Sequence, residues 1–547
     1  MRKFANWWKQ DKRYVTMCKA VFLGLLPVLC CLVYCAMQGK TIGQVYLPES
    51  EWNDELFYYK QVEGIVNFGY PLGYFGFNES HALKLSFAAW SPVLVFPWII
   101  WGFLFGWNLM SPIICNIVLM TLCCFLFVWL VKPTWKQLGV LGLLFCLYTP
   151  FVRYMLSVMP EVICFSMLIL FYGLAINYLQ RERTYKLVLL FVMSGVMTLM
   201  RPYLLLFLLL PMFFWIRKSG WKGMLGSGAV LVVVLGVYAA IKHYLGAEYF
   251  APLFFTDWVT AFFEEGFFGG IRYTLSKLYQ MGKGFYGHTI QGLRTGLASG
   301  AFFAGYLVMM LVLIGQSFVD WRKWRRLCRR ENRETGEQDA AGRAEQDDRI
   351  GRQLVIEAHL AFSFVAMLFA LLLMYKLTEG SKHLLTFMAA GVFVVAMMET
   401  RFFKKAVLIG VTFAYLYSYM AVTPYDYQVP FLREERQAQV EEWRGVMAES
   451  MPLNREDVPN FDNVVIWVFS DVTEQGGRLT PWQLLYALPE GFGISCCMQE
   501  YVINNFEALQ SRYIAAPSGG QIEERCRMEG CIEIGRDKDM VIYELRR

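Results

Sequence analysis

The chain has 547 residues, of which 56% are hydrophobic, 17% aromatic and only 18% charged. A soluble globular protein carries about a quarter charged residues, and residues 115–131 and 224–241 hold no charge at all. Each stretch is long enough to cross a bilayer, which takes roughly 20 apolar residues per helix. The composition therefore excludes a soluble enzyme, a disordered hub and a fibrous repeat. The small net charge of +6, clustered beside apolar runs, also argues against a nucleic-acid-binding module.

The N-terminal residues 1–19 carry six Lys or Arg side chains against the single acid Asp11. Cations within about 15–20 residues of a membrane span mark its cytoplasmic side. We therefore expect a cytoplasmic N-terminus and a first span at residues 20–37 that runs outward. A long apolar core with no small-residue cleavage site after it argues against a cleaved signal peptide.

Residues 38–90 are polar and aromatic, and residues 38–108 are predicted to form the first external loop. Residues 91–106 contain two prolines and five aromatic side chains, which suits helices lying at the outer membrane interface. If this segment crossed the membrane, Lys132 and Lys136 would face outside. The positive-inside rule therefore places the second span at residues 109–131.

Apolar runs and cation clusters alternate regularly along the rest of the chain, which predicts 11 spans in all. The remaining nine are residues 138–152, 162–179, 187–200, 203–216, 224–241, 295–319, 356–375, 384–398 and 406–422. Residues 242–294 should form a second long external loop, which could cover a sugar site or grip an acceptor. Residues 320–352 should be cytoplasmic because positions 322–333 hold seven cations. This loop is predicted to be flexible or partly helical.

The tail, residues 423–547, follows a transmembrane domain at residues 20–422 and differs from it in composition. Strands are predicted at residues 464–469, 513–516 and 540–545, and helices at 482–487 and 501–511. The predicted fold class is a polytopic α-helical membrane protein with a small external α/β C-terminal domain. Four cysteines in this tail, Cys496, Cys497, Cys526 and Cys531, allow a disulfide whose connectivity the sequence leaves open. A metal site is the weaker alternative because the tail has no histidine.

The first external loop carries four carboxylates within residues 49–55, close to the end of the first span. A carboxylate near low-dielectric lipid has a raised pKa and can serve as a base. The alternative is that these acids are ordinary solvated loop residues.

The order of motifs resembles the GT-C superfamily of membrane glycosyltransferases, which includes protein O-mannosyltransferases and the lipid A aminoarabinose transferase. The chain has Asp54-Glu55 followed by Tyr58, and then a polar stretch with His81 and Lys84. An interfacial segment ending at Phe105-Gly106, a second acid after Pro160, and the sequence Met-Arg-Pro-Tyr at 200–203 follow in the same order. The second acid is Glu161, where the superfamily more often has aspartate.

The resemblance implies transfer of a sugar from a polyprenyl-phosphate or polyprenyl-diphosphate donor to a glycan, lipid or protein on the outer face. Asp54 would be the general base of an inverting displacement, Glu55 would orient the acceptor or Asp54, and Glu161 would be a second acid. External cations would bind the donor phosphate. These candidates are Lys84, Arg153, Arg201, Arg294, Lys382 and His383. The candidate substrate-binding residues are Tyr58, His81 and His288.

No cofactor is expected on this interpretation, and a divalent metal is possible but not expected. The expected partners are the polyprenyl-linked sugar donor, the acceptor and membrane lipid. No nucleic acid is expected as a partner. A bacterial cell membrane is the expected location. Three alternatives remain open. They are a transporter or flippase for lipid-linked glycans, a glycan polymerase or ligase of another fold, and a non-enzymatic assembly protein.

Overall fold

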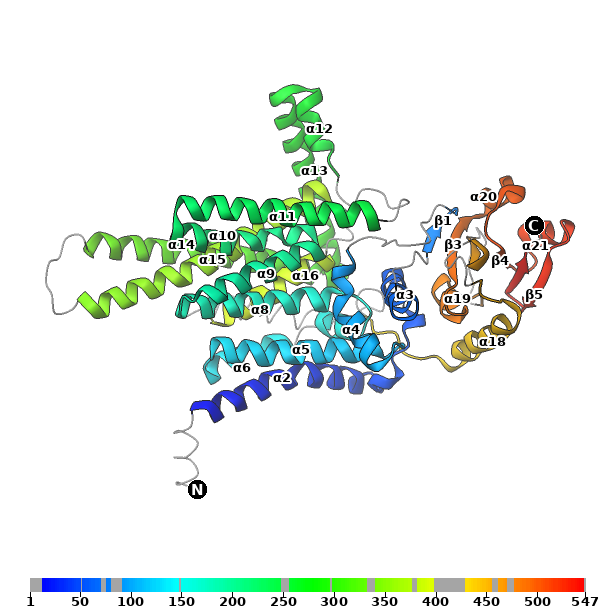
Figure 1. The fold of residues 1–547 in the computed structure, drawn as a ribbon, viewed down its shortest axis with the longest axis horizontal. Helices are drawn as coiled ribbons and strands as arrows, with labels where there is room; N and C mark the ends of the chain where they lie inside the picture. The colour runs from blue at the N-terminus through cyan, green and yellow to red at the C-terminus, as the bar shows by residue number, and fades with distance from the viewer. Residues whose placement is uncertain are drawn as a thin grey trace, which may run out of the picture.

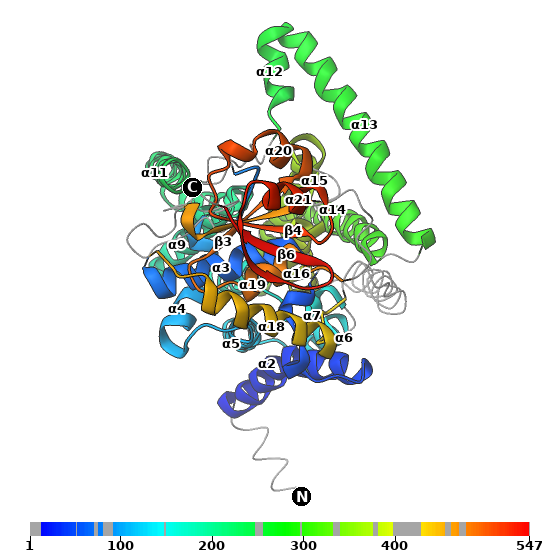
Figure 2. The same ribbon diagram turned by 90° about the vertical axis from the view of Figure 1, so that its right-hand side faces the viewer.

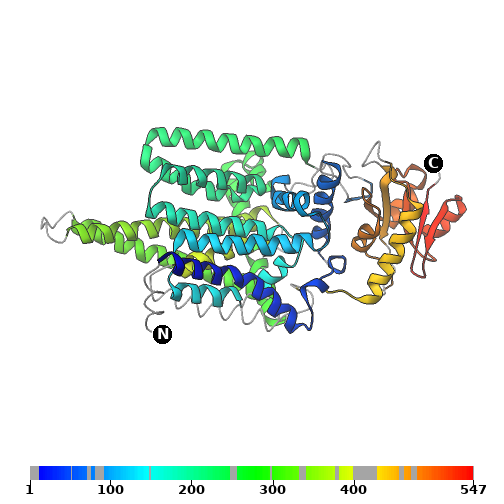
Figure 3. The same ribbon diagram turned by 60° about the horizontal axis from the view of Figure 1, so that its bottom comes forward.

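The computed structural model describes most of the chain, and the account below concerns these residues only. The described ranges are 12–50, 52–69, 75–79, 91–146, 149–246, 255–295, 298–331, 340–375, 381–397, 428–454, 461–469 and 477–545. Figure 1 shows a bundle of nearly parallel helices, with the C-terminal α/β domain beyond one end of it. Figure 3 shows the same two parts from another side, with α3 (Asn53–Phe68) and α4 (Phe96–Phe105) between them.

The bundle is built from helices with apolar segments, which range from 7 to 35 residues in length and pack side by side. They are α2 (Lys12–Met37), α5 (Ser111–Val131), α6 (Trp135–Cys146), α7 (Thr149–Met155), α8 (Glu161–Gln180), α9 (Thr184–Met200), α10 (Leu209–Ser219), α11 (Trp221–Leu245), α14 (Ala298–Glu331), α15 (Ala340–Met374) and α16 (Ser381–Met397). Short 3-10 helices lie at Ile42–Gln44, Leu47–Glu49, Pro92–Val95 (η3) and Pro202–Leu208 (η4). Among them α8 is the most central candidate span, with 78% of its apolar window buried.

Seven described helices are long and apolar enough to cross a bilayer, and α4, α9 and α16 are shorter apolar helices. The chain is therefore a multi-pass membrane protein. The ten residues of α4 extend for about 15 Å, half of a typical hydrocarbon core, which agrees with an interfacial segment. The predicted span at 138–152 comprises α6 and α7. The predicted span at 406–422 lies outside the described residues, so the total of 11 stays a prediction.

Both long polar insertions contain helices. Residues 242–294 form the end of α11 followed by a hairpin of α12 (Asp257–Glu264) and α13 (Gly266–Thr295). In the insertion predicted to be cytoplasmic, α14 continues to Glu331 and α15 begins at Ala340. Figure 1 shows these two helices extending past the rest of the bundle at the end away from the sheet. The charged insertion is therefore partly helical, as the sequence suggested.

The C-terminal domain holds a six-stranded sheet in the order β1-β3-β2-β4-β6-β5. The strands are β1 (Phe75–Phe77), β2 (Val464–Phe469), β3 (Gly493–Met498), β4 (Tyr513–Pro517), β5 (Ile532–Arg536) and β6 (Met540–Glu544). The helices of this domain are α18 (Glu434–Ser450), α19 (Pro481–Ala487), α20 (Gln499–Asn504) and α21 (Gln521–Met528). The first four strands in this order are parallel, and β6 pairs antiparallel with both β4 and β5.

Alternate residues of the central strands enter two different cores. Val465 and Trp467 of β2 belong to the large core shared with the bundle, whereas Ile466 and Val468 belong to a smaller core against α20 and α21. This division follows from the two-residue period of a strand, which sends neighbouring side chains to opposite faces. A sheet covered on both faces explains why β2 is apolar along almost its whole length.

Strand β1 comes from the loop between α2 and α5, which the sequence predicts to be external, and not from the tail. It pairs in parallel with β3, and Glu79 after it accepts hydrogen bonds from the backbone N–H groups of Gln510 (3.0 Å) and Ser511 (2.6 Å). The Glu79 N–H in turn donates to Ser495 Oγ at 2.8 Å. The described part of this loop that holds β1 and the tail therefore form one folded unit.

The four tail cysteines are free thiols in this structure. Cys496 and Cys497 are adjacent on β3 and enter opposite cores. Burial raises the pKa of the Cys497 thiol to about 11, so this side chain stays neutral near pH 7. No disulfide joins the sheet to its helices, and apolar packing holds this part of the fold.

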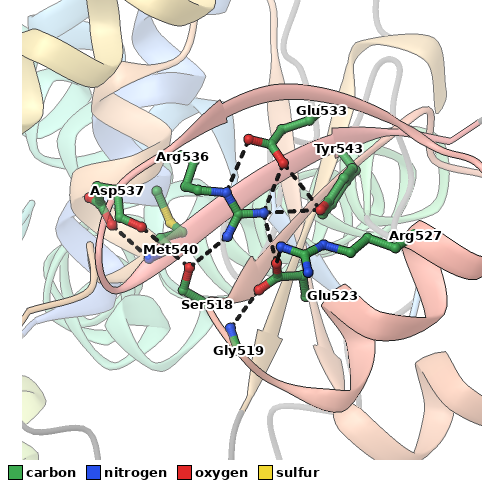
Figure 4. Close-up of polar contacts among 9 residues, drawn as sticks. All are labelled: Ser518, Gly519, Glu523, Arg527, Glu533, Arg536, Asp537, Met540 and Tyr543. Carbon is green, nitrogen blue, oxygen red and sulfur yellow. Dashed lines mark hydrogen bonds and ion pairs between the residues drawn. The ribbon is translucent and has the colours of Figure 1, made fainter.

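A polar network attaches α21 to the antiparallel strands at the edge of the sheet (Figure 4). Arg536 donates to Glu533 (2.8 Å), to Glu523 (2.7 Å) and to Ser518 (3.2 Å). Burial opposes ionisation of Glu523, but hydrogen bonds from Arg536 and from the Gly519 N–H lower its pKa overall. Hydrogen bonds from Arg536 likewise lower the pKa of Glu533.

Replacing Arg536 with methionine should loosen this edge of the sheet. Charge-assisted hydrogen bonds contribute about 1.5–3 kcal/mol each to stability, so amide exchange of β5 and β6 in the full chain should accelerate at least tenfold. Both carboxyl pKa values are lowered in the folded state, so the stabilisation is present at neutral pH and disappears as pH falls through them. The matched control is Arg444→Met, whose exposed pair with Glu441 spans 3.8 Å. Equal exchange in both variants would contradict the network's structural role.

Candidate functional site

Asp54 lies in the first turn of α3, a position where a negative charge interacts favourably with the helix dipole. Its carboxylate accepts a hydrogen bond from Lys382 Nζ at 2.6 Å. The side chain of Asp54 is 36% exposed and that of Lys382 19% exposed. Lys382 is in the first turn of α16, where the helix dipole makes a positive charge unfavourable. The negative charge of Asp54 offsets this unfavourable interaction. This is the most accessible acid–cation pair of the site.

The next residue, Glu55, points the other way and is completely buried. Its two oxygens accept hydrogen bonds from Arg153 at 3.0 and 3.3 Å, and one of them also accepts from the Val158 N–H at 3.2 Å. Arg153 also donates to Ser50 Oγ at 3.0 Å, and its guanidinium lies 3.8 Å from the centre of the Trp52 ring. This bidentate pair anchors the start of α3 to α7 and so holds Asp54 in place.

A second buried pair lies between α8 and the junction of α9 with η4. Glu161 accepts from Arg201 at 2.6 Å, and the two side chains are 0% and 1% exposed. Pro202 ends α9, which puts Arg201 at the junction of two helices. Arg201 lies 3.2 Å from His383 Nδ1 and donates to the Tyr203 hydroxyl at 3.0 Å. Four side chains from three separate segments therefore form one polar cluster.

Tyr58 connects the exposed pair with the buried cluster. It lies one helical turn after Asp54 on α3 and is 7% exposed. Burial raises the pKa of its phenol well above 10; Arg201 lowers it, and Asp54 and Glu161 raise it. Tyr58 therefore stays protonated near neutral pH and can donate a hydrogen bond to an anionic oxygen.

The predicted residues separate into three groups. Asp54, Tyr58, Glu161, Arg201, Lys382 and His383 lie together, and the Glu55–Arg153 pair supports them from the side. His288 and Arg294 are on α13, where His288 packs edge-on against Phe303 and Arg294 is exposed. No described contact links these two side chains to Asp54. His81 and Lys84 lie outside the described residues.

Two tyrosines belong to this site although the sequence did not single them out as site residues. Tyr203 hydrogen-bonds both Arg201 and His383 (3.1 Å), and Tyr375 packs edge-on against the His383 ring. Tyr203 is part of the Met-Arg-Pro-Tyr sequence, so its proximity to Arg201 was a usable signal. Tyr375 follows α15 and offers no comparable signal.

The tail domain contacts the segment that carries Asp54. Trp482 Nε1 of α19 donates to the Trp52 carbonyl at 2.9 Å, and Glu49 lies 3.6 Å from Arg433. Burial raises the pKa of Glu49, and Arg433 and Arg436 lower it. The tail domain therefore holds the segment that leads into α3 and Asp54.

Among the described residues, no three His, Cys, Asp or Glu side chains lie close enough together to hold a metal ion. The expectation that no metal is needed stays a prediction. The functional groups that the site does offer are an accessible carboxylate, a buried second acid, three cationic or imidazole side chains and protonated phenols.

No family model and no curated protein matches this chain. Solved structures that resemble it include the oligosaccharyltransferase of Archaeoglobus fulgidus in the apo form, at 11% identity and a TM-score of 0.49 over 92% of this chain and 70% of that one. The oligosaccharyltransferase AglB of the same archaeon, in complex with an inhibitory peptide and a dolichol-phosphate, gives the same identity and TM-score over 93% and 70%. A third structure, of the Archaeoglobus fulgidus oligosaccharyltransferase in complex with zinc and sulfate, has 12% identity and a TM-score of 0.47 over 91% of this chain and 68% of that one.

All three likenesses have TM-scores below 0.5. The likeness concerns the path of the chain, and identity of 11–12% assigns no residue roles. The function proposed below therefore rests on the side chains of the site.

Proposed function

We propose that this protein is an inverting membrane glycosyltransferase that moves a sugar from a polyprenyl-phosphate or polyprenyl-diphosphate donor to an acceptor hydroxyl on the outer face. The supporting observation is the convergence at one place of an accessible carboxylate, Asp54, with Lys382 and the Glu161–Arg201 pair. Charge is scarce in this chain, and these charges come from segments up to 328 positions apart. In this proposal the carboxylate serves the acceptor hydroxyl, and the cations serve the phosphate of the donor.

In the proposed reaction Asp54 takes the proton of the acceptor hydroxyl while the acceptor oxygen bonds to the anomeric carbon of the donor sugar. The bond between that carbon and the donor phosphate oxygen breaks, and the phosphate keeps the electron pair. Lys382 and Arg201 stabilise the charge that develops on the leaving phosphate. Glu55 does not react; with Arg153 it positions Asp54.

Lys382 has a double role in this proposal. In the structure it neutralises Asp54, but its flexible ammonium can turn toward a donor phosphate when one binds. The carboxylate then loses its ion-pair partner and becomes a better base. Donor binding would thereby switch on the acceptor side of the site, which favours ordered binding with the donor first.

The proposed orientation is the one predicted from the sequence, with a cytoplasmic N-terminus and an external C-terminal domain. The proposed location is a bacterial cell membrane. Arg153, Arg294, Lys84, His81 and His288 keep their proposed substrate roles only as secondary candidates. Arg153 takes the positioning role described above, because its guanidinium holds Glu55 and Ser50 at the start of α3.

The decisive experiment uses the full chain in proteoliposomes with a radiolabelled polyprenyl-phosphate sugar and a mixture of glycan, lipid and peptide acceptors. We expect a new glycosidic product and release of polyprenyl phosphate. Movement of the labelled lipid between leaflets without a glycosidic product would instead identify a flippase. Chain extension of the donor itself would identify a polymerase.

Lys382→Met should raise the KM for the lipid-linked donor about tenfold or more, because one charge-assisted contact to phosphate is lost. Lys382→Arg should retain most of the donor affinity, since it keeps the charge. The comparison is made from initial rates at varied donor concentration. An unchanged donor KM in Lys382→Met would contradict the phosphate role and leave Asp54 unaffected.

A further inference from the structure

The helical hairpin of α12 and α13 has a surface that the proposed reaction does not use. Its two helices are held together by Asp257, which accepts from Tyr273 and from Lys277, each at 2.6 Å. Gly266, with φ of +74°, makes the turn between them. Gly270 lies so close to Phe262 that a Cβ atom there would be 2.4 Å from its ring. The hairpin is therefore a packed unit.

The same side of α13 that contacts α12 also contacts the bundle. Phe285 and His288 pack edge-on against Phe303 of α14, and a Cβ atom on Gly300 would be 2.5 Å from the backbone of Gly292. These contacts fix the hairpin to the beginning of α14. The opposite side of α13 has no protein neighbour among the described residues.

That opposite side carries a row of large apolar side chains. They are Phe268 (84% exposed), Leu275 (61%), Tyr279 (74%) and Tyr286 (68%). Their spacings of seven, four and seven residues place them on one line of a helix with 3.6 residues per turn. Exposure of one such residue is normal, but a straight row of four indicates a surface that is covered in the working protein.

The charged side chains of α13 indicate what covers this apolar row. Across its 30 residues α13 has no acid, and it carries Arg272, Lys277, Lys283 and Arg294. Arg272, Lys283 and Arg294 are exposed and lie beside the apolar row. An apolar row flanked by cations fits the boundary between acyl chains and anionic phosphate headgroups.

The direction of the hairpin gives the second argument. In Figure 1 the bundle helices run horizontally while α12 and α13 stand upright, and Figure 2, which looks along the bundle, shows α13 over its full length. The hairpin therefore lies across the bundle axis, parallel to a membrane that the bundle crosses. It follows α11, in which only Gly223 and Ser227 are buried, so the exposed surface of α11 faces lipid. The hairpin is thus the next described element after a helix whose exposed surface faces lipid.

We propose that α12 and α13 lie in the outer surface of the membrane, with Phe268, Leu275 and Tyr279 inserted at the boundary between headgroups and acyl chains. Arg272 and Lys283 bind lipid phosphates beside them. This proposal is independent of the glycosyltransferase activity. The hairpin is a lipid anchor about 45 Å long, from the 1.5 Å rise per residue of a helix.

The test attaches an environment-sensitive fluorophore to single introduced cysteines in the full chain, reconstituted in vesicles that contain anionic lipid. The variants are Phe268→Cys and Leu275→Cys in the row, with Gln280→Cys as the matched control, exposed on the same helix about a third of a turn away. Labelling of the unsubstituted chain is subtracted. Lipids brominated on their acyl chains should quench positions 268 and 275 at least twofold more than position 280.

Equal quenching at all three positions would overturn the proposal. So would fluorescence at position 268 that changes with the protein-to-lipid ratio, because this result would indicate that a second copy of the chain covers the row. Two row positions are used so that a local effect of one substitution cannot decide the outcome.

Discussion

Replacing Asp54 with asparagine should reduce glycosyl transfer about 100- to 10,000-fold, the range typical for loss of a general base. Asparagine has the same shape and can still contact Lys382, but it cannot accept the acceptor's proton. Because Asp54 is 36% exposed, its exposed pair contributes little to folding. The variant should therefore express and purify like the parent protein, and the loss should appear in kcat.

The matched control is Glu49→Gln, the same change of carboxylate to amide in the same external loop. Glu49 faces Arg433 and Gln483 of the tail domain, not Lys382. Its partner Arg433 is 80% exposed, so solvent screens this pair and transfer should fall by less than about threefold. Retained transfer in Asp54→Asn would refute the assignment of Asp54 as base. An equal loss in both variants would indicate a general requirement for negative charge in the loop.

The sequence predicted the main elements well where one strong signal decided them. Apolar length identified the bundle helices, and β-branched runs predicted β2 and β6 almost to the residue. It did not predict β3, because Gly493–Met498 contains Gly, Ser and two Cys and lacks the usual strand composition. It also did not predict β1, since three residues are too few to give a periodic pattern.

The site was accessible to sequence reasoning because charge is scarce in the membrane and each external charge needs an explanation. This argument selected Arg201 and Lys382 among the cations, and the resemblance selected Asp54 and Glu161. The structure brings these four together, whereas Arg294, selected in the same way as the other cations, lies exposed on α13. It could not assign partners, because Asp54 and Lys382 are 328 positions apart and Glu55 and Arg153 are 98 apart. Which acid is buried and which is accessible depends on helix orientation around α3, and that is a tertiary property.

The buried Glu161–Arg201 pair gives the second large expected effect. Glu161→Gln and Arg201→Met should each lower the free energy of unfolding by about 3–5 kcal/mol, because each leaves a buried charge without its partner. Both single variants should also lose transfer. Unfolding midpoints in detergent micelles measure the first effect, and product formation measures the second.

The single variants cannot separate a structural role from a functional one, but the double variant Glu161→Leu/Arg201→Met can. Replacing both partners of a buried ion pair with apolar side chains is often neutral or stabilising, so the double variant should regain most of the lost stability. If Arg201 binds the leaving phosphate, the restored fold should still transfer sugar at least 100-fold more slowly than the parent. Normal transfer by the double variant would show that this pair only supports the fold, and Asp54 and Lys382 would then carry the chemistry without it.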